Sequence, residues 1–195
     1  MNIFLRVALF YFFFWGIIAC TNKKPADTLS NKAVADTAKY YPIASFIADE
    51  MKYVDLRNFT IVEKISKDID TSSRKISKDD FLSAASIILK QAQWFTANKN
   101  LFTESIFQDL GTESYTINYS STKASIKNID LLLNQQTNLP KRLFIRVIQS
   151  SGDTTITEQY SWVANKQFVI SCSKRTAEGF NESSSKEISW KNQDQ

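Results

Sequence analysis

The chain has 195 residues, a formal net charge of +4, two cysteines and no histidine. The absence of histidine excludes Ser-His-Asp and Cys-His catalysis, histidine-ligated zinc, haem or copper, and an imidazole pH switch. The small positive charge is too weak to indicate nucleic-acid binding, so we expect no nucleic-acid partner. The length suits one domain with some residues left over.

Residues 1–19 have the pattern of an export signal. Arg6 is their only charged residue, and an uncharged apolar run extends from Val7 to Ala19. This run of 13 residues is shorter than the ~20 residues that span a bilayer core. We therefore expect residues 1–19 to form a signal peptide.

Cys20 follows Ile17-Ile18-Ala19, and these four residues resemble the bacterial lipobox. The resemblance implies cleavage between Ala19 and Cys20, a diacylglycerol on the Cys20 thiol and a further acyl chain, such as palmitate, on its amine. Three acyl chains exceed the roughly two signals needed for stable membrane attachment. The alternatives are an uncleaved N-terminal helix and an ordinary secretory signal followed by a chance cysteine.

The residues after Cys20 indicate where such a lipoprotein would reside. Thr21 stands where an aspartate would resemble the inner-membrane retention cue, and no acidic cluster resembling a surface-export tag follows. We therefore expect a lipid-anchored protein of the outer membrane that faces the periplasm.

Residues 20–40 are expected to form the lipidated cysteine and a flexible tether. Residues 21–40 are polar, lack hydrophobic periodicity and include Pro25. As a coil they would reach about 25 Å. Thr28, Thr37 and the later Thr154 each follow an aspartate, and this pattern resembles the O-glycosylation acceptor of Bacteroidota.

Residues 41–191 are expected to form one domain, followed by a polar tail over 192–195. One helix is predicted to begin near Pro42, and a second to begin after Ser77, with Asp79 and Asp80 favouring its positive end. We prefer this interpretation, in which Asp79 and Asp80 stabilise the helix start, to a paired acid/base site, because adjacent helical residues point in different directions. The apolar stripes of the two helices are Ile43, Phe46, Ile47 and Val54, then Phe81, Ala84, Ala85, Ile88, Ala92 and Phe95.

Two further segments near these helices are assigned from local pattern. A strand is predicted over Asn58–Lys67, with a polar turn over Asp68–Ser73. The apolar residues Phe102, Ile106, Phe107 and Leu110 predict a short helical turn that ends at Gly111.

The remainder of the chain reads as antiparallel strands joined by short turns. Strands are predicted around Tyr115–Tyr119, Ala124–Asn134 with a bulge near Asn128, Leu143–Ile148 as a central strand, Ile156–Trp162, Phe168–Cys172 and Ile188–Trp190. Turns are predicted at Ser151-Gly152-Asp153 and Asn165-Lys166. The expected fold class is α+β, with two or three N-terminal helices packed on a curved antiparallel meander of about five to seven strands.

Few residues suggest chemistry. Cys172 would be the one thiol left after lipidation, and its parity with Phe168 and Ile170 predicts an inert core cysteine. No catalytic residues, metal site or cofactor is expected, because Asp68-Ile69-Asp70 lacks the spacing of a calcium loop and the glycines are too few for a phosphate loop. Some aromatic residues would either fill the core or line an apolar-ligand groove between helices and sheet, namely Trp94, Phe107, Tyr119, Tyr160 and Trp162.

The layout looks like that of uncharacterised Bacteroidota-type lipoproteins. The resemblance covers most of residues 41–190 and is carried by the lipobox, Tyr41–Ile47, Leu101–Phe107 and Ser151–Thr155. It implies no known activity and no catalytic residues.

We therefore expect a non-enzymatic envelope lipoprotein whose domain binds a partner protein or packs in an envelope complex. The alternative is a carrier of lipid or another apolar ligand, because a curved sheet covered by helices is similar to a lipoprotein-carrier cradle. An enzyme is the third hypothesis, and the absence of histidine and of a recognisable catalytic motif gives it little support.

Overall fold

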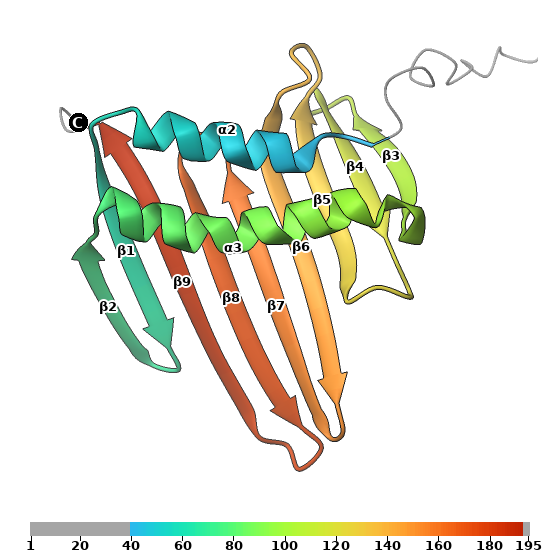
Figure 1. Ribbon diagram of the computed structural model, residues 1–195. Helices are drawn as coiled ribbons and strands as arrows, with labels where there is room; N and C mark the ends of the chain where they lie inside the picture. Colours follow the sequence, from blue (N-terminus) through green and yellow to red (C-terminus); the bar gives the residue numbers. More distant parts are fainter. Residues whose placement is uncertain (1–39, 193–195) are drawn as a thin grey trace, which may run out of the picture. The chain divides into compact units, whose positions relative to one another are not determined.

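The computed structural model describes residues 40–192 (Figure 1). The predicted signal peptide, Cys20, Thr28 and Thr37 lie outside this range, as do residues 193–195. Between Tyr40 and Asn192 no helix is both long and apolar enough to cross a membrane.

The described chain forms two α-helices, one 3-10 turn and nine antiparallel strands, a mixed α+β fold. In chain order these are α2 (Ile43–Asp55), β1 (Phe59–Lys67), β2 (Asp70–Lys75), α3 (Lys78–Ala97), η1 (Lys99–Leu101), β3 (Thr103–Asp109), β4 (Ser114–Ser120), β5 (Ile126–Asn134), β6 (Pro140–Ser151), β7 (Thr154–Val163), β8 (Gln167–Thr176) and β9 (Asn181–Asn192). The strand order in the sheet is β2-β1-β9-β8-β7-β6-β5-β4-β3.

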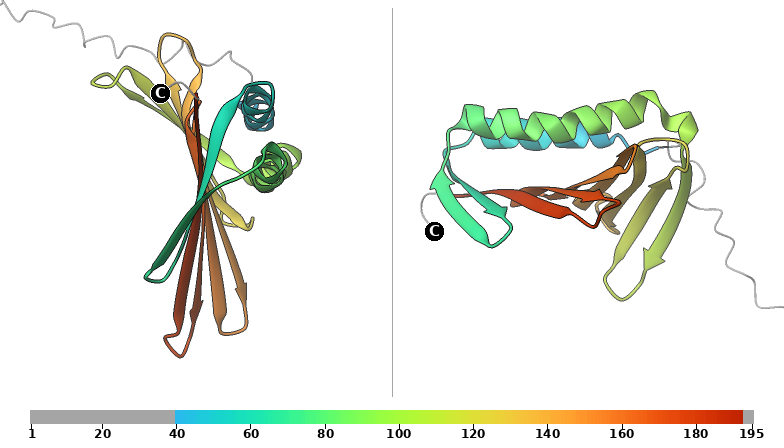
Figure 2. Two further views of the ribbon diagram at one scale, coloured as in Figure 1. Left: turned by 90° about the vertical axis from the view of Figure 1, so that its left-hand side faces the viewer. Right: turned by 90° about the horizontal axis from the view of Figure 1, so that it is seen from below.

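The two helices lie side by side across one face of the sheet (Figures 1 and 2). The opposite face carries no helix from the described residues, and we call it the uncovered face. Strands β3 to β9 form an antiparallel meander, which was predicted from β4 onwards, and β9 then pairs with β1 from the start of the domain.

Two parts of the predicted architecture are wrong. The helices do not both precede the sheet, because the β1–β2 hairpin lies between α2 and α3. The sheet also has nine strands in residues 40–192 rather than five to seven. The predicted strand over Asn58–Lys67, which is β1, already separates the two helices. The error in strand number comes from the outermost strands, β2 and β3, which carry little of the alternating apolar pattern that marks a strand.

The segments predicted as turns are these same edge strands. The turn expected over Asp68–Ser73 is only Asp68-Ile69, and the all-exposed strand β2 follows it directly. The expected helical turn over Phe102–Leu110 is strand β3, paired with β4 along its whole length. In both segments pairing with a neighbouring strand decides the structure, and the spacing of apolar residues along the sequence does not reveal that pairing.

The start of α3 confirms the predicted cap. The Ser77 hydroxyl accepts a hydrogen bond from the backbone N–H of Asp80 at 3.1 Å, and the Asp80 carboxylate accepts from the Ser77 backbone N–H at 3.2 Å. This reciprocal capping box satisfies two donors that a helix start otherwise leaves free. Asp80 is therefore engaged in capping, and the Ser77 hydrogen bonds lower the pKa of its carboxyl.

Several predicted turns and strands are also confirmed. The register of β5 against β6 shifts between Ile126 and Asn128, where the bulge was expected, and β6 is central in the sheet. Asn165, in the turn between β7 and β8, has a φ of 57°, in the left-handed region that asparagine tolerates well.

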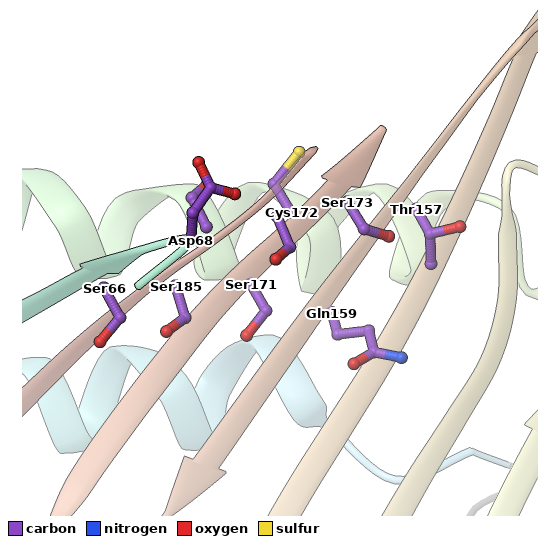
Figure 3. A pocket seen from close by; sticks show the side chains of 10 residues that line it. Ser66, Asp68, Thr157, Gln159, Ser171, Cys172, Ser173 and Ser185 are labelled. Carbon is purple, nitrogen blue, oxygen red and sulfur yellow. The ribbon is translucent and has the colours of Figure 1, made fainter. Parts of the chain in front are cut away.

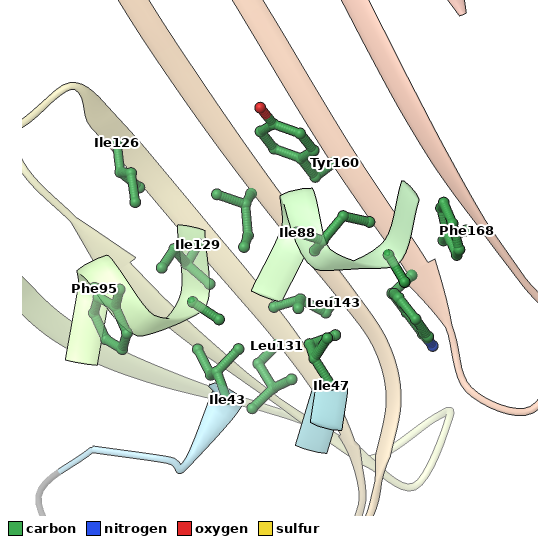
Figure 4. Close-up of a cluster of buried hydrophobic side chains, with 14 of the residues drawn as sticks. Ile43, Ile47, Ile88, Phe95, Ile126, Ile129, Leu131, Leu143, Tyr160 and Phe168 are labelled. Carbon is green, nitrogen blue, oxygen red and sulfur yellow. The ribbon is translucent and has the colours of Figure 1, made fainter. Parts of the chain in front are cut away.

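The core lies between the helices and the sheet (Figure 4). From the helices it takes Ile43 and Ile47 of α2 and Ile88 and Phe95 of α3, all at most 1% exposed. From the sheet it takes alternate residues, whose neighbours in sequence therefore point to the uncovered face. The sheet residues include Ile129, Leu131, Leu143, Ile145, Tyr160, Trp162, Phe168 and Ile188.

Candidate binding surfaces

The space between helices and sheet is filled by aromatic side chains. The ring of Trp162 stacks on that of Phe168 with centroids 4.9 Å apart, and Phe95 packs on Tyr119 at 4.8 Å. Trp162, Phe168, Phe95 and Tyr119 are all fully buried. These side chains form a packed core, which is the first of the two arrangements considered for them, and they leave no room for an apolar-ligand groove at this place.

Most polar atoms in this layer are also engaged, although the buried Nε1 of Trp190 has no hydrogen-bond partner among the described residues. Glu50 of α2 is 8% exposed, and its Oε2 accepts hydrogen bonds from Trp162 Nε1 at 3.1 Å and from the Asn165 backbone N–H at 2.8 Å. The Tyr119 hydroxyl accepts from the backbone N–H of Tyr41 at 2.8 Å, and the Tyr160 hydroxyl donates to Glu158 at 2.9 Å. Burial raises the pKa of both tyrosines.

The five predicted groove residues do not meet in one place. Tyr119, Tyr160 and Trp162 lie in the core beneath the helices. Trp94 is 37% exposed on α3, where its ring contacts Phe102 edge-on at 6.4 Å. Phe107 is 62% exposed and pairs with Thr116, which places it on the uncovered face at the edge of the sheet.

The most densely charged buried position is Glu63 on β1. It is 4% exposed, and its carboxylate contacts Arg74 at 2.7 Å and Lys186 at 3.2 Å, on the strands to either side. Burial alone would raise the pKa of Glu63, but the hydrogen bonds and charges of Arg74 and Lys186 outweigh burial and lower it. This cluster ties β2, β1 and β9 together, and both cations already have a partner.

The uncovered face has a mixed apolar and basic centre on β6, β5 and β7. Phe144 of β6 is half-buried there, and the exposed Arg142 and Arg146 flank it at two residues before and after. Leu132 of β5 and Val163 of β7 lie opposite Arg142 on the neighbouring strands. We call these five residues the Phe144 patch.

Charge on the uncovered face is biased towards the basic side. Arg142 and Arg146 form no ion pair with any described residue, whereas Lys64 lies directly opposite Glu187. Asp130, which is next to Phe144, accepts a hydrogen bond from the Asn118 side chain at 2.7 Å. The two arginines are therefore the accessible charges of the Phe144 patch.

A shallow pocket of about 390 Å³ lies near the β1–β2 hairpin (Figure 3). Ser66, Ser185, Ser171 and Gln159 form a row across four adjacent strands, and Asp68 and Thr157 add to the lining. The lining offers hydroxyl and amide groups, which suit hydrogen bonding to a neutral polar surface.

Cys172 lies at this pocket and is half-buried rather than in the centre of the core. Its strand parity with Phe168 is as predicted, but its side chain is not among those buried in the core. Burial first, and then the charges of Glu158 and Glu182, raise the pKa of its thiol. A raised pKa leaves little thiolate at neutral pH, which is the state of an unreactive cysteine.

The remaining sequence-predicted position, Thr154, is the first residue of β7 and is half-buried. In the described part of the chain no three acidic or cysteine side chains gather in a way that would hold a metal ion.

Sequence reasoning missed the Phe144 patch. The one available signal was that Leu143–Ile148 has apolar residues at both parities, which predicted a central strand. That pattern equally places an apolar residue on the face opposite the core, between two arginines.

In comparisons with known proteins, no family model, no curated protein and no solved structure matches the chain.

Proposed function

We propose that the chain is a lipid-anchored protein of the bacterial outer membrane, facing the periplasm, whose domain is a non-enzymatic binding module. Residues 1–19 would be removed as a signal peptide and Cys20 would carry the lipid. The domain would hold a partner protein against its uncovered face. The sequence of residues 1–20 supports the anchor, and the Phe144 patch supports the binding surface.

The Phe144 patch is the observation that carries the binding proposal. Protein interfaces are enriched in aromatic residues and arginine, and their hot spots combine an apolar anchor with hydrogen-bonding charge. Phe144 supplies the apolar anchor, and Arg142 and Arg146 supply two cations without partners among the described residues. Charge complementarity therefore favours a partner protein with an acidic surface around an apolar centre.

The packed aromatic core favours a binding module over a carrier of apolar ligands. A carrier needs space between the helices and the sheet, and Tyr119 and Trp162 occupy that space with no exposed surface. Opening it would also break the hydrogen bond from Trp162 to Glu50.

The anchor is tested by metabolic labelling with radioactive palmitate in a bacterial host. The native chain should incorporate label, and Cys20→Ser should lose it entirely because the acceptor thiol is gone. Cys172→Ser, the matched control, should keep it. Continued labelling of Cys20→Ser would refute the lipid anchor.

The binding surface is tested by placing a photo-cross-linking amino acid at Val163, inside the Phe144 patch, in cells. A second variant carries the cross-linker at Ser83, on the exposed side of α3. We expect a discrete adduct from Val163 only, formed with a protein whose identified surface is acidic. Charge reversal by Arg142→Glu with Arg146→Glu should abolish the adduct.

Two exposed lysines away from the uncovered face, Lys90 and Lys123, supply the control for charge reversal. Lys90→Glu with Lys123→Glu changes the net charge by the same amount and should leave the adduct intact. The proposal fails if Val163 gives no adduct, or if both double variants weaken the adduct equally.

A further inference from the structure

The two edges of the described sheet differ in a way that bears on assembly. An edge strand exposes backbone N–H and C=O groups that can pair with another chain. Edge strand β2 has the sequence Asp-Thr-Ser-Ser-Arg-Lys, without an apolar side chain. Edge strand β3 instead exposes Ile106 by 43% and Phe107 by 62%, and it has no lysine, arginine or proline.

Exposed apolar residues concentrate at the β3 edge. Three of the ten large hydrophobic residues exposed in the described chain lie within the five residues Ile106–Leu110. Lysines and prolines on an edge strand are the usual protection against unwanted pairing, and β3 has neither, since its two charges are the carboxylates of Glu104 and Asp109. A strand of this kind is suited to pairing with a partner strand.

We infer that β3 pairs antiparallel with β3 of a second copy of this chain, centred on Ile106. In that register Ile106 faces Ile106 of the other copy on the side of the helices. Glu104 faces Gln108, so that each carboxylate meets an amide donor. On the uncovered face Ser105 lies opposite Phe107, and Thr103 lies opposite Asp109.

This register is the best matched of those that a two-fold axis allows. It pairs all seven residues of β3 and sets no like charges directly opposite each other. The two Phe107 rings lie diagonally across the seam, within reach of aromatic contact. A shift of two residues in one direction sets Glu104 against Ile106, and in the other direction it sets Ile106 against Gln108. Both shifted registers also pair fewer residues.

The β2 edge lacks these properties. Its Arg74 is already bound to Glu63 at 2.7 Å, and pairing there would bury no apolar side chain. Pairing through β3 would make one continuous sheet, with the uncovered faces of both copies on the same side. It uses only the edge of the sheet, so it holds whether or not the Phe144 patch binds a partner.

The test is disulfide cross-linking of the full chain in intact cells, with Cys172→Ser as the background. Opposed side chains in a sheet have Cβ atoms about 4.5–5.5 Å apart, close enough for a disulfide after a small shift. Adding Ile106→Cys should give a cross-linked dimer of twice the chain's mass. Ser72→Cys, at the β2 edge, should give no more dimer than the Cys172→Ser chain alone. That chain still contains Cys20, so it measures any cross-linking through Cys20.

The register is tested with two differently tagged chains. Co-expressed Glu104→Cys and Gln108→Cys chains should cross-link to each other. Glu104→Cys should not cross-link to itself, because the two positions would be about 13 Å apart along the strands. Adding Phe107→Lys to the Ile106→Cys chain should abolish the dimer, whereas adding Ser72→Lys should not. The inference fails if Ile106→Cys cross-links no more than Ser72→Cys, or if Glu104→Cys cross-links to itself as well as to Gln108→Cys.

Discussion

Glu50 and Trp162 are 112 residues apart in sequence and share a buried hydrogen bond of 3.1 Å from the indole Nε1 to the carboxylate Oε2. The same oxygen accepts from the backbone N–H of Asn165 in the β7–β8 turn. One acidic residue on α2 therefore fixes the helix both to the central sheet and to one hairpin end. Among the described residues, no cation neutralises Glu50 within ion-pair distance.

This arrangement predicts that Glu50→Ala destabilises the domain by about 2–4 kcal/mol, because two donors would lose their acceptor. Glu50→Gln should cost less, since its amide oxygen can still accept both hydrogen bonds. Urea unfolding followed by tryptophan fluorescence measures both changes. Equal losses for the two variants would show that the charge of Glu50, rather than its acceptor oxygen, is what matters.

The ion cluster at Glu63 predicts a loss of stability in acid. Its pKa is lowered in the folded state, so its contribution is present above the pKa of an unfolded glutamate, about 4.3, and is lost as pH falls through the folded value. The urea midpoint of the native chain should therefore fall below about pH 4.

In Glu63→Gln that acid-dependent fall should be reduced, and stability at pH 7 should be below that of the native chain. Glu178→Gln, at an exposed loop position, is the control and should follow the native curve. If Glu63→Gln showed an unchanged pH profile, the stabilising ion cluster would be refuted.

The parts of the fold that the sequence predicts well are those with a local signal. The start of α3 follows from Ser77 and the acidic residues of its first turn, and its buried stripe from Phe81 to Phe95 is as expected. The β7–β8 turn is marked by Asn165-Lys166 and by alternating apolar residues on either side. In each case residues within a few positions of one another determine the structure.

The edges of the sheet could not be predicted in this way. Strand β2 has no apolar residue to reveal its period, and it exists because it pairs with β1. Ile106 of strand β3 has helix-like spacing with Phe102 and Leu110, which flank the strand, but the pairing of β3 with β4 decides its structure. Phe107 consequently lies on the opposite face from Tyr119, so the two residues cannot line one groove, as the alternative hypothesis required. Which residues lie together on the uncovered face depends on the register of many strands, and no short segment of the sequence encodes that register.

Ser77→Ala should destabilise the domain by about 1 kcal/mol, because the N–H of Asp80 would lose its capping acceptor at the start of α3. Ser83→Ala is the matched control, since it makes the same substitution at an exposed interior position of α3, where alanine favours the helix. Thermal unfolding followed by circular dichroism compares the two. A Ser77→Ala domain as stable as the Ser83→Ala domain would mean that the capping box contributes nothing.

The raised pKa of Cys172 predicts slow alkylation in the folded protein. The thiolate is the reactive species, so at pH 7 iodoacetamide should modify Cys172 more slowly in the folded chain than in urea, and the folded rate should still be rising above pH 8.5, where an ordinary thiol begins to level off. Mass spectrometry of the peptide that contains Cys172 measures this rate separately from any reaction at Cys20. Folding that increased the rate at pH 7 would instead indicate an activated nucleophile, and the unreactive assignment of Cys172 would have to be abandoned.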